Sequence, residues 1–203
     1  MFDDFITPRP APPNRKAFCP DGIEENLSEG AVIIAFTMYL FLRLPDLKHV
    51  VIHPDGEHGK RFPLRATLER RGFKLVEPMG VASYGGLYSA ETGQTVLVNP
   101  KPERGDVVAD MAGRSFVAEC KGGIVNTKHP GQQSRLRKGL CEAIGQCLAS
   151  PLEDGMQQYA VVPHTPVTKK LARRMAPRAN KAGITIALVD RLGNVSAEPE
   201  VDN

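Results

Sequence analysis

The sequence predicts a single-domain α/β protein, and three observations carry this prediction. Three short strands follow one another at 95–100 and within 105–123, as in an antiparallel meander. A strand, a helix and a strand then follow over 159–190, an order that implies a crossover connection. With 203 residues, 41% of them hydrophobic, the chain is long enough for one core and too short for two sizeable ones.

The first half of the predicted domain begins after a proline-rich segment. Residues 1–20 hold five prolines, so we expect an extended arm rather than a packed element. Asp21 and Glu24 have the spacing of a capping box, which predicts a mostly buried helix over 23–44. The next predicted elements are a strand, a helix ended by glycine, a strand and a glycine-rich loop, at 49–54, 64–72, 73–78 and 79–93.

The second half of the domain contains a long amphipathic helix. Over 132–149, apolar side chains recur every four positions beside Cys147 and predict a core-facing stripe of Leu136, Leu140, Ile144 and Leu148. The crossover follows as a strand at 159–164, a basic helix at about 168–182 and a strand at 184–190. We expect the domain to cover 21–195 and the acidic residues 196–203 to be a disordered tail.

Composition excludes several classes of protein. The four cysteines form no C-x-x-C pair, so neither a zinc site nor a disulfide framework is indicated, and we expect a reducing, cytoplasmic setting. The start of the chain does not resemble a signal peptide, and no apolar run reaches the roughly 20 residues of a membrane span, so no membrane partner is expected. A formal charge of +3 does not by itself indicate nucleic-acid binding.

The stretch GDVVADMAGRSFVAECKGG, residues 105–123, predicts a hairpin that carries charge at one end. Side chains two apart in a strand share a face, so Glu119 and Lys121 point one way. The opposite, apolar face carries Phe116, Ala118 and Cys120. A two-residue turn at Ala112-Gly113 would place Asp106 directly opposite Glu119.

Two facing carboxylates destabilise a sheet unless a positive group lies between them. Asp106, Glu119 and the backbone carbonyl of Cys120 form a donor set suited to Mg²⁺ or Mn²⁺. Lys121 would then assist the attacking water or balance charge on a phosphate. The hairpin therefore predicts a metal site for phosphodiester chemistry.

The hairpin resembles the active site of the PD-(D/E)xK, or restriction-endonuclease-like, nuclease superfamily, with Gly105 where the family name has proline. The helix segment EAIGQCLA is similar to the one that supplies a glutamine in many branches, here Gln146. Glu29 is similar in placement to an acid on the first core helix, which would complete the metal site. The resemblance implies a mixed sheet flanked by helices and metal-dependent phosphodiester hydrolysis.

From this resemblance we expect an endonuclease that cuts DNA, with Gln146 positioning water or backbone. Cutting both strands of a duplex would favour a homodimer, and a partner protein would supply recognition if the chain does not act alone. Two alternatives stay open. One is a non-catalytic nucleic-acid-binding or assembly subunit with the same fold, and the other is a nuclease that acts on RNA.

Two basic segments are candidates for phosphate contact. The first follows the hairpin at the start of the long helix, and its basic residues are Lys128, His129, Arg135, Arg137 and Lys138. The second lies on the helix of the crossover, and its basic residues are Lys169, Lys170, Arg173 and Arg174. Ordinary solvated surface is the competing interpretation for both.

Three further acidic or histidine-containing patterns have simpler explanations. Pro45–Lys48 repeats the acid-x-lysine spacing without a preceding acidic strand, so we expect it to leave the first helix. Asp110 shares a face with Asp106 but lies about 13 Å from the level of Glu119 at strand rise, so we expect a polar residue near the turn. The stretch 53–60 contains proline and glycine and is predicted to be a turn; it includes His53, Asp55, Glu57 and His58.

Overall fold

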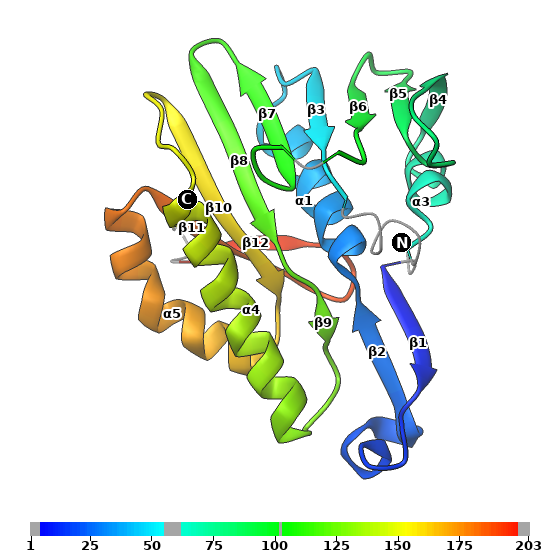
Figure 1. The fold of residues 1–203 in the computed structure, drawn as a ribbon, viewed down its shortest axis with the longest axis vertical. Helices are drawn as coiled ribbons and strands as arrows, with labels where there is room; N and C mark the ends of the chain where they lie inside the picture. Colours follow the sequence, from blue (N-terminus) through cyan, green and yellow to red (C-terminus); the bar gives the residue numbers. More distant parts are fainter. Residues whose placement is uncertain (1–4, 55–61, 102, 199–203) are drawn as a thin grey trace.

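The computed structural model describes residues 5–54, 62–101 and 103–198, and a mixed nine-stranded sheet runs through it (Figure 1). The strands follow the order β12-β11-β10-β8-β7-β3-β6-β5-β4 across the sheet. Their bounds are β3 His49–Ile52, β4 Phe73–Pro78, β5 Gly86–Ala90, β6 Thr95–Val98, β7 Val107–Met111, β8 Arg114–Cys120, β10 Met156–Pro163, β11 Ile184–Val189 and β12 Val195–Glu198. Strand β10 is parallel to both β8 and β11, and β3 is parallel to β6, so the sheet is mixed.

Four α-helices occur in the described part of the chain, and they cover both faces of the sheet. They are α1 Glu29–Arg43, α3 Leu64–Arg70, α4 Pro130–Ala149 and α5 Pro166–Lys181. Alternate side chains of β10 show the two layers: Val161 joins the core around α1, whereas Ala160 and Val162 join the core under α4 and α5. Both faces of the central strands are therefore buried. No helix within the described ranges is long and apolar enough to cross a membrane.

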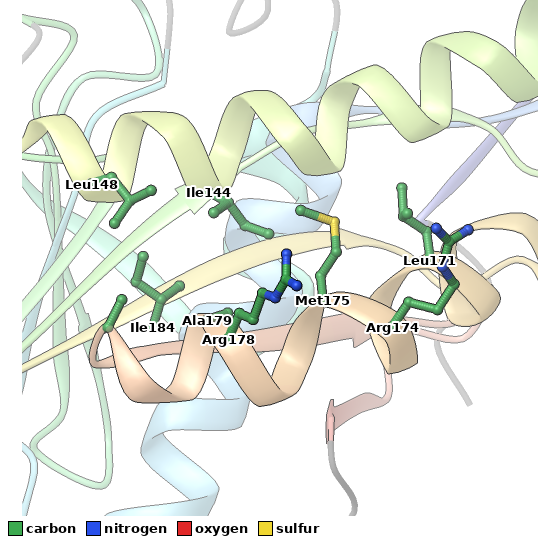
Figure 2. Close-up of a pocket in the computed structure, with 9 residues that line it drawn as sticks. Ile144, Leu148, Leu171, Arg174, Met175, Arg178, Ala179 and Ile184 are labelled. Carbon is green, nitrogen blue, oxygen red and sulfur yellow. The ribbon is translucent and has the colours of Figure 1, made fainter.

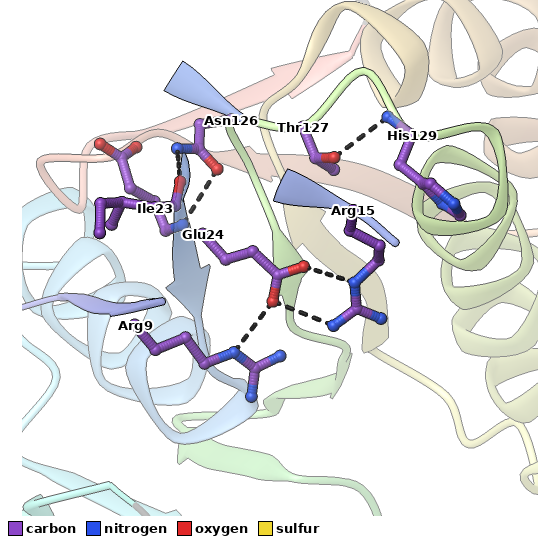
Figure 3. A network of polar contacts seen from close by, with 8 residues as sticks. Arg9, Arg15, Ile23, Glu24, Asn126, Thr127 and His129 are labelled. Carbon is purple, nitrogen blue, oxygen red and sulfur yellow. Dashed lines mark hydrogen bonds and ion pairs between the residues drawn. The ribbon is translucent and has the colours of Figure 1, made fainter. Parts of the chain in front are cut away.

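A second, three-stranded sheet holds the N-terminal segment against the rest of the protein. It consists of β1 Ile6–Pro10, β2 Ile23–Leu27 and β9 Gly123–Ile124. Glu24 of β2 is fully buried, and its carboxylate pairs with Arg9 at 3.1 Å and with Arg15 at 2.7 Å (Figure 3). A buried charge is tolerated only when it is paired, so these arginines permit an acid inside this sheet.

The prediction for the N-terminal region was wrong in two respects. Residues 6–10 are extended as expected, but they pair antiparallel with β2 instead of forming an unpacked arm. The helix predicted over 23–44 begins at Glu29, where the Ser28 side chain accepts a hydrogen bond from the Ala31 N–H. Ser28 is therefore the helix cap, and the segment before it is a strand, because its hydrogen bonds go to β1.

The predicted meander was also wrong, although its hairpin was right. Strand β3 lies between β6 and β7, so the 95–100 strand does not pair with the hairpin. Within the hairpin, Val108 faces Val117 and Asp110 faces Ser115, as predicted. The segment 79–93, expected to be a loop, contains strand β5.

Near the C-terminus, the crossover is confirmed and three details differ. Strand β10 begins at Met156, earlier than expected. In α4, Leu148 is 62% exposed and Cys147 takes its place in the core. The expected tail is ordered as far as Glu198, because β12 pairs antiparallel with β11, and 199–203 lie outside the described residues.

Gly122 determines how closely the end of β8 approaches the start of α1. A Cβ atom at this position would lie 2.6 Å from the Leu27 carbonyl oxygen and would also press on the backbone nitrogen of Glu29. Only glycine lets the two backbones meet at this distance. The neighbouring residues, Lys121 and Glu29, are thereby brought together.

We predict that Gly122→Ala lowers the free energy of unfolding by about 1 to 3 kcal/mol, because the added methyl group meets backbone that cannot rotate away. Gly145→Ala is the matched control, since a Cβ there meets nothing within 4 Å and the exchange within a helix should stabilise by about 0.5 to 1 kcal/mol. Urea unfolding followed by circular dichroism measures both. Equal stability of the two variants would contradict the close approach.

Candidate functional site

Three elements meet around Lys121, which directly follows β8. Its Nζ lies 3.9 Å from Glu29 Oε2 on the first turn of α1 and 3.8 Å from Glu142 Oε1 on α4. The Lys121 and Glu29 side chains are largely buried, whereas Glu142 is exposed. The site therefore joins residues that are far apart in the sequence, and it includes the predicted Lys121 and Glu29.

Asp106 directly precedes β7 and reaches across to the end of β8. Its backbone N–H donates to the Ala118 carbonyl at 2.8 Å, and its Oδ2 accepts from the Cys120 N–H at 2.7 Å. Since Val107 pairs with Ala118, one further step along the ladder brings Asp106 level with Glu119. The carboxylate is thus fixed by backbone hydrogen bonds beside Glu119, as the hairpin register predicted.

Burial and like charge perturb both hairpin carboxyls. Burial raises the pKa of Asp106 to about 7, the Cys120 N–H opposes this shift, and the charges of Glu29 and Glu119 add to it. Burial also raises the pKa of Glu119; Lys121 opposes that shift and Glu29 adds to it. Each of these carboxylates therefore lies in an environment that disfavours its own ionisation.

For Lys121, the surrounding charges outweigh burial and favour the charged form. Burial lowers its pKa, but Glu29, Asp106, Glu142 and Glu119 together outweigh burial and raise the pKa above its ordinary value. The side chain is therefore an ammonium ion at neutral pH. One ammonium group faces several carboxylates, so full ionisation leaves an excess of negative charge that a divalent cation would offset.

The donor set fits Mg²⁺ or Mn²⁺ in its chemistry. Carboxylates of Asp106, Glu119 and Glu29 and the carbonyl of Cys120 are hard oxygen ligands, which these ions prefer. In the conformation described, no three His, Cys, Asp or Glu side chains of the described residues are gathered closely enough to hold an ion. Asp106 instead accepts the Cys120 N–H, which occupies one of its oxygens.

A groove of about 550 Å³ opens beside Lys121, between the small N-terminal sheet and α4. Its lining includes Glu29, Glu142 and four basic residues, which are Arg9, Lys121, Arg135 and Lys138. Figure 3 shows how buried Glu24 holds the Arg9 side chain, whose Nε it binds at 3.1 Å. The groove therefore combines two carboxylates with four basic residues, one of which is held by a buried carboxylate, whereas Asp106 and Glu119 are not among its lining residues.

The structure separates the predicted phosphate-contact residues into two groups. Arg135 and Lys138 line the groove with Lys121, whereas Arg137 is exposed and does not line it. Lys128 is exposed, and its N–H donates to the Phe18 carbonyl. His129 stacks edge-on against Phe18 with ring centroids 5.0 Å apart, so packing accounts for its position.

Gln146 is exposed and does not line the groove. The adjacent residue, Cys147, is buried, and its thiol donates to the Tyr159 carbonyl at 3.5 Å. Neighbouring positions on a helix differ by about 100° in direction, so Gln146 points away from that core. Its catalytic role remains a prediction.

The competing acidic and histidine-containing patterns lie away from the site. Asp110 is exposed and pairs with Arg104 at 3.6 Å. His53 is buried, and its Nδ1 is 2.8 Å from the Lys101 carbonyl, while Asp55, Glu57 and His58 lie outside the described residues. Pro45–Lys48 follows α1 as expected.

Sequence reasoning missed three residues of this groove: Arg9, Gln132 and Glu142. Arg9 falls in the segment predicted to be an extended arm, because no local pattern shows that residues 6–10 pair with β2. Glu142 could have been found, since it stands four positions before Gln146 and so on the same helix face. Gln132 is buried although polar, which only the packing of α4 reveals.

Gly105 differs from the proline of the resembled motif for a conformational reason. Its φ angle is +79°, a left-handed conformation that the ring of proline forbids. The chain therefore enters β7 through a glycine turn, and Asp106 is positioned by its own hydrogen bonds.

We predict that Asp106→Asn changes the pH dependence of stability in the metal-free protein. Burial raises the Asp106 pKa from 3.8 to about 7, so between these values the folded protein binds more protons than the unfolded chain. The free energy of unfolding of the wild type should therefore fall as the pH rises through this window. The asparagine variant should fall less steeply and be more stable at pH 8 by about 1 to 3 kcal/mol.

Urea unfolding in EDTA at a series of pH values measures this difference. Asp110→Asn is the control, because it removes an exposed carboxylate near the same strand, and its curve should parallel that of the wild type. Parallel curves for wild type and Asp106→Asn would show that Asp106 is not held in an unfavourable environment.

Comparisons of the chain with protein-family models, with curated proteins and with solved structures find no match.

Proposed function

We propose that the protein is a restriction-endonuclease-like nuclease that hydrolyses phosphodiester bonds in DNA with Mg²⁺ or Mn²⁺. One observation carries the proposal. At one end of β8, Lys121 lies within 3.9 Å of Glu29 of α1, and the charge of Glu29 acts on Asp106, Glu119 and Lys121 of the hairpin. A purely structural sheet gains nothing from carboxylates on facing positions of neighbouring strands.

The order of elements supports the same proposal. An N-terminal helix with an acid at its start precedes the charged hairpin, and a long helix and a parallel crossover follow it. The resemblance implied a mixed sheet flanked by helices and an acid on the first core helix, and this order of elements agrees with both. The two outer sheet edges are less informative, since they carry none of the site residues.

Asp106, Glu119 and the Cys120 carbonyl would hold the metal ion, and Glu29 would complete its ligands. When bound, a divalent ion supplies positive charge to the reacting phosphate and lowers the pKa of a bound water. The excess of carboxylates over ammonium groups supports this assignment, because a cation would offset the charges of Glu29 and Glu119, which add to the rise in the Asp106 pKa that burial causes.

Lys121 acts as a cation in this proposal, because its raised pKa keeps it protonated at neutral pH. A protonated amine cannot accept the proton of the attacking water. It would instead stabilise negative charge that develops on the scissile phosphate. Glu29 and Glu142 hold the ammonium group in place from two sides.

The basic residues of the groove would bind the nucleic-acid backbone. Arg9, Arg135 and Lys138 line the groove beside Lys121, and their positive charges would contact phosphates of the backbone. No aromatic side chain lines the described part of this groove, so we infer binding through phosphates rather than through stacked bases.

We predict that the purified protein cuts supercoiled plasmid DNA in Mg²⁺ or Mn²⁺ and not in EDTA. Asp106→Ala, Glu119→Ala and Lys121→Ala should each lose at least about 100-fold in rate, because each removes a metal ligand or the charge that faces the phosphate. Asp110→Ala, an exposed residue near the same strand, is the control and should cut as the wild type does.

Cleavage by all variants would assign the activity to a contaminant. A gel shift of DNA without cleavage would favour the non-catalytic binding subunit, and cleavage of RNA alone would change the substrate class.

We also predict that the groove residues set the salt dependence of DNA binding. Arg135→Ala and Lys138→Ala should each reduce the slope of log affinity against log salt concentration by about 1, since each removes one phosphate contact. Arg137→Ala is the matched control, because it lies next to Lys138 outside the groove. Fluorescence anisotropy with a labelled duplex in Ca²⁺ measures the slopes, and equal slopes for Lys138→Ala and Arg137→Ala would remove the groove from the interface.

A further inference from the structure

A second groove, of about 500 Å³, lies between α4 and α5 and takes no part in the charged site (Figure 2). Its walls are apolar and include Ile144 and Leu148 of α4 and Leu171 and Met175 of α5. Leu148 is 62% exposed, although it belongs to the helix face that turns toward α5. Covering such side chains is worth about 25 cal/mol for each Å² removed from water.

Two arginines stand over this apolar groove. Arg174 and Arg178 are one turn apart on α5, and Figure 2 shows Arg178 reaching toward α4 beside Met175. Neither forms an ion pair with an acidic side chain of the described residues, whereas the adjacent Arg173 pairs with Glu198 at 3.8 Å. The groove therefore offers an apolar floor and positive charge that its surroundings do not neutralise.

The charge of α5 as a whole strengthens this feature. Its sequence PVTKKLARRMAPRANK contains no acidic residue and six basic ones, while the whole chain carries only +3. The charge is thus concentrated on one helix beside the groove. An occupant with acidic groups would be attracted to it, and a basic occupant would be repelled.

The apolar lining and the two arginines together argue against two other binding partners. A second copy of this chain that placed the same groove against this one, across a two-fold axis, would bring Arg174 and Arg178 against the same arginines. Nucleic acid would gain the arginine contacts but would place its phosphates or bases against Leu148, Ile144 and Met175, none of which is aromatic. Neither of these partners would both cover the apolar side chains and neutralise the arginine charges.

We propose that this groove binds an acidic amphipathic helix of a partner protein. Leucine-like side chains spaced as i, i+3, i+4 and i+7 would lie against Ile144, Leu148 and Met175. Glutamate or aspartate beside this stripe would pair with Arg174 and Arg178. The groove uses the C-terminal end of α4, and residues nearer the start of the same helix line the charged groove, so a bound partner would stand beside the candidate active site.

The test uses the full chain and three labelled helical peptides of about 16 residues, long enough for the four anchor positions. The first carries leucine at these positions with flanking glutamates. In the second, lysine replaces every glutamate, and in the third, serine replaces every leucine. Fluorescence anisotropy gives the affinities, and the ¹³C-methyl signal of Met175 reports whether the peptide occupies the groove.

The acidic peptide should bind at least about 10-fold more tightly than the lysine and serine peptides, and it should shift the Met175 signal. Arg174→Glu with Arg178→Glu should reverse the preference in favour of the lysine peptide. Lys170→Glu with Lys181→Glu is the matched control, because it makes the same charge change on exposed positions of α5 outside the groove, and it should keep the acidic preference. Leu148→Ser should weaken binding by at least about 5-fold.

Four results would overturn the proposal. Two concern the peptides: no binding of the acidic peptide up to about 1 mM, or equal binding of the acidic and lysine peptides. The third is the same effect from both charge-reversal variants, and the fourth is displacement of the peptide by a DNA duplex that itself shifts the Met175 signal. None of these depends on cleavage, so the partner site and the nuclease are tested separately.

Discussion

The close approach of two backbones at Gly122 is the contact on which the candidate site depends. The end of β8 lies against the start of α1 in space, and a side chain at position 122 would push the two backbones apart. Because the two backbones touch, the residues on either side, Lys121 and Glu29, come within ion-pair distance. The charged hairpin alone would be a pair of carboxylates and a lysine, whereas this contact adds a third carboxylate from another part of the chain.

The same contact makes the site electrostatically costly in the absence of a cation. Burial raises the pKa values of Asp106 and Glu119, and the charge of Glu29 adds to both shifts, while the single ammonium group of Lys121 faces these carboxylates and Glu142. Such an arrangement lowers stability unless a positive ion or a reacting group offsets the repulsion. Stability and proposed function are therefore linked through the same four side chains.

The helix α4 connects the candidate site with the second groove. Arg135, Lys138 and Glu142 of α4 line the charged groove, and Ile144 and Leu148, nearer the C-terminal end of the helix, line the groove beside α5. Both surfaces of α4 lie beside one buried apolar stripe, which contains Leu136, Leu140 and Ile144. A helix that is buried along one stripe can carry two different surfaces beside it.

The sequence by itself determined the hairpin with its turn and register, the helices of the second half and the crossover, because each depends on residues close together in the chain. It also predicted which charges end β8, since strand parity fixes the direction of Glu119 and Lys121. Tertiary structure alone decided that β3 separates β6 from β7, that residues 6–10 form a strand and that Arg9 enters the groove. These features depend on pairing between distant segments, such as Glu24 with Arg9 and Arg15, and no local pattern records such pairing.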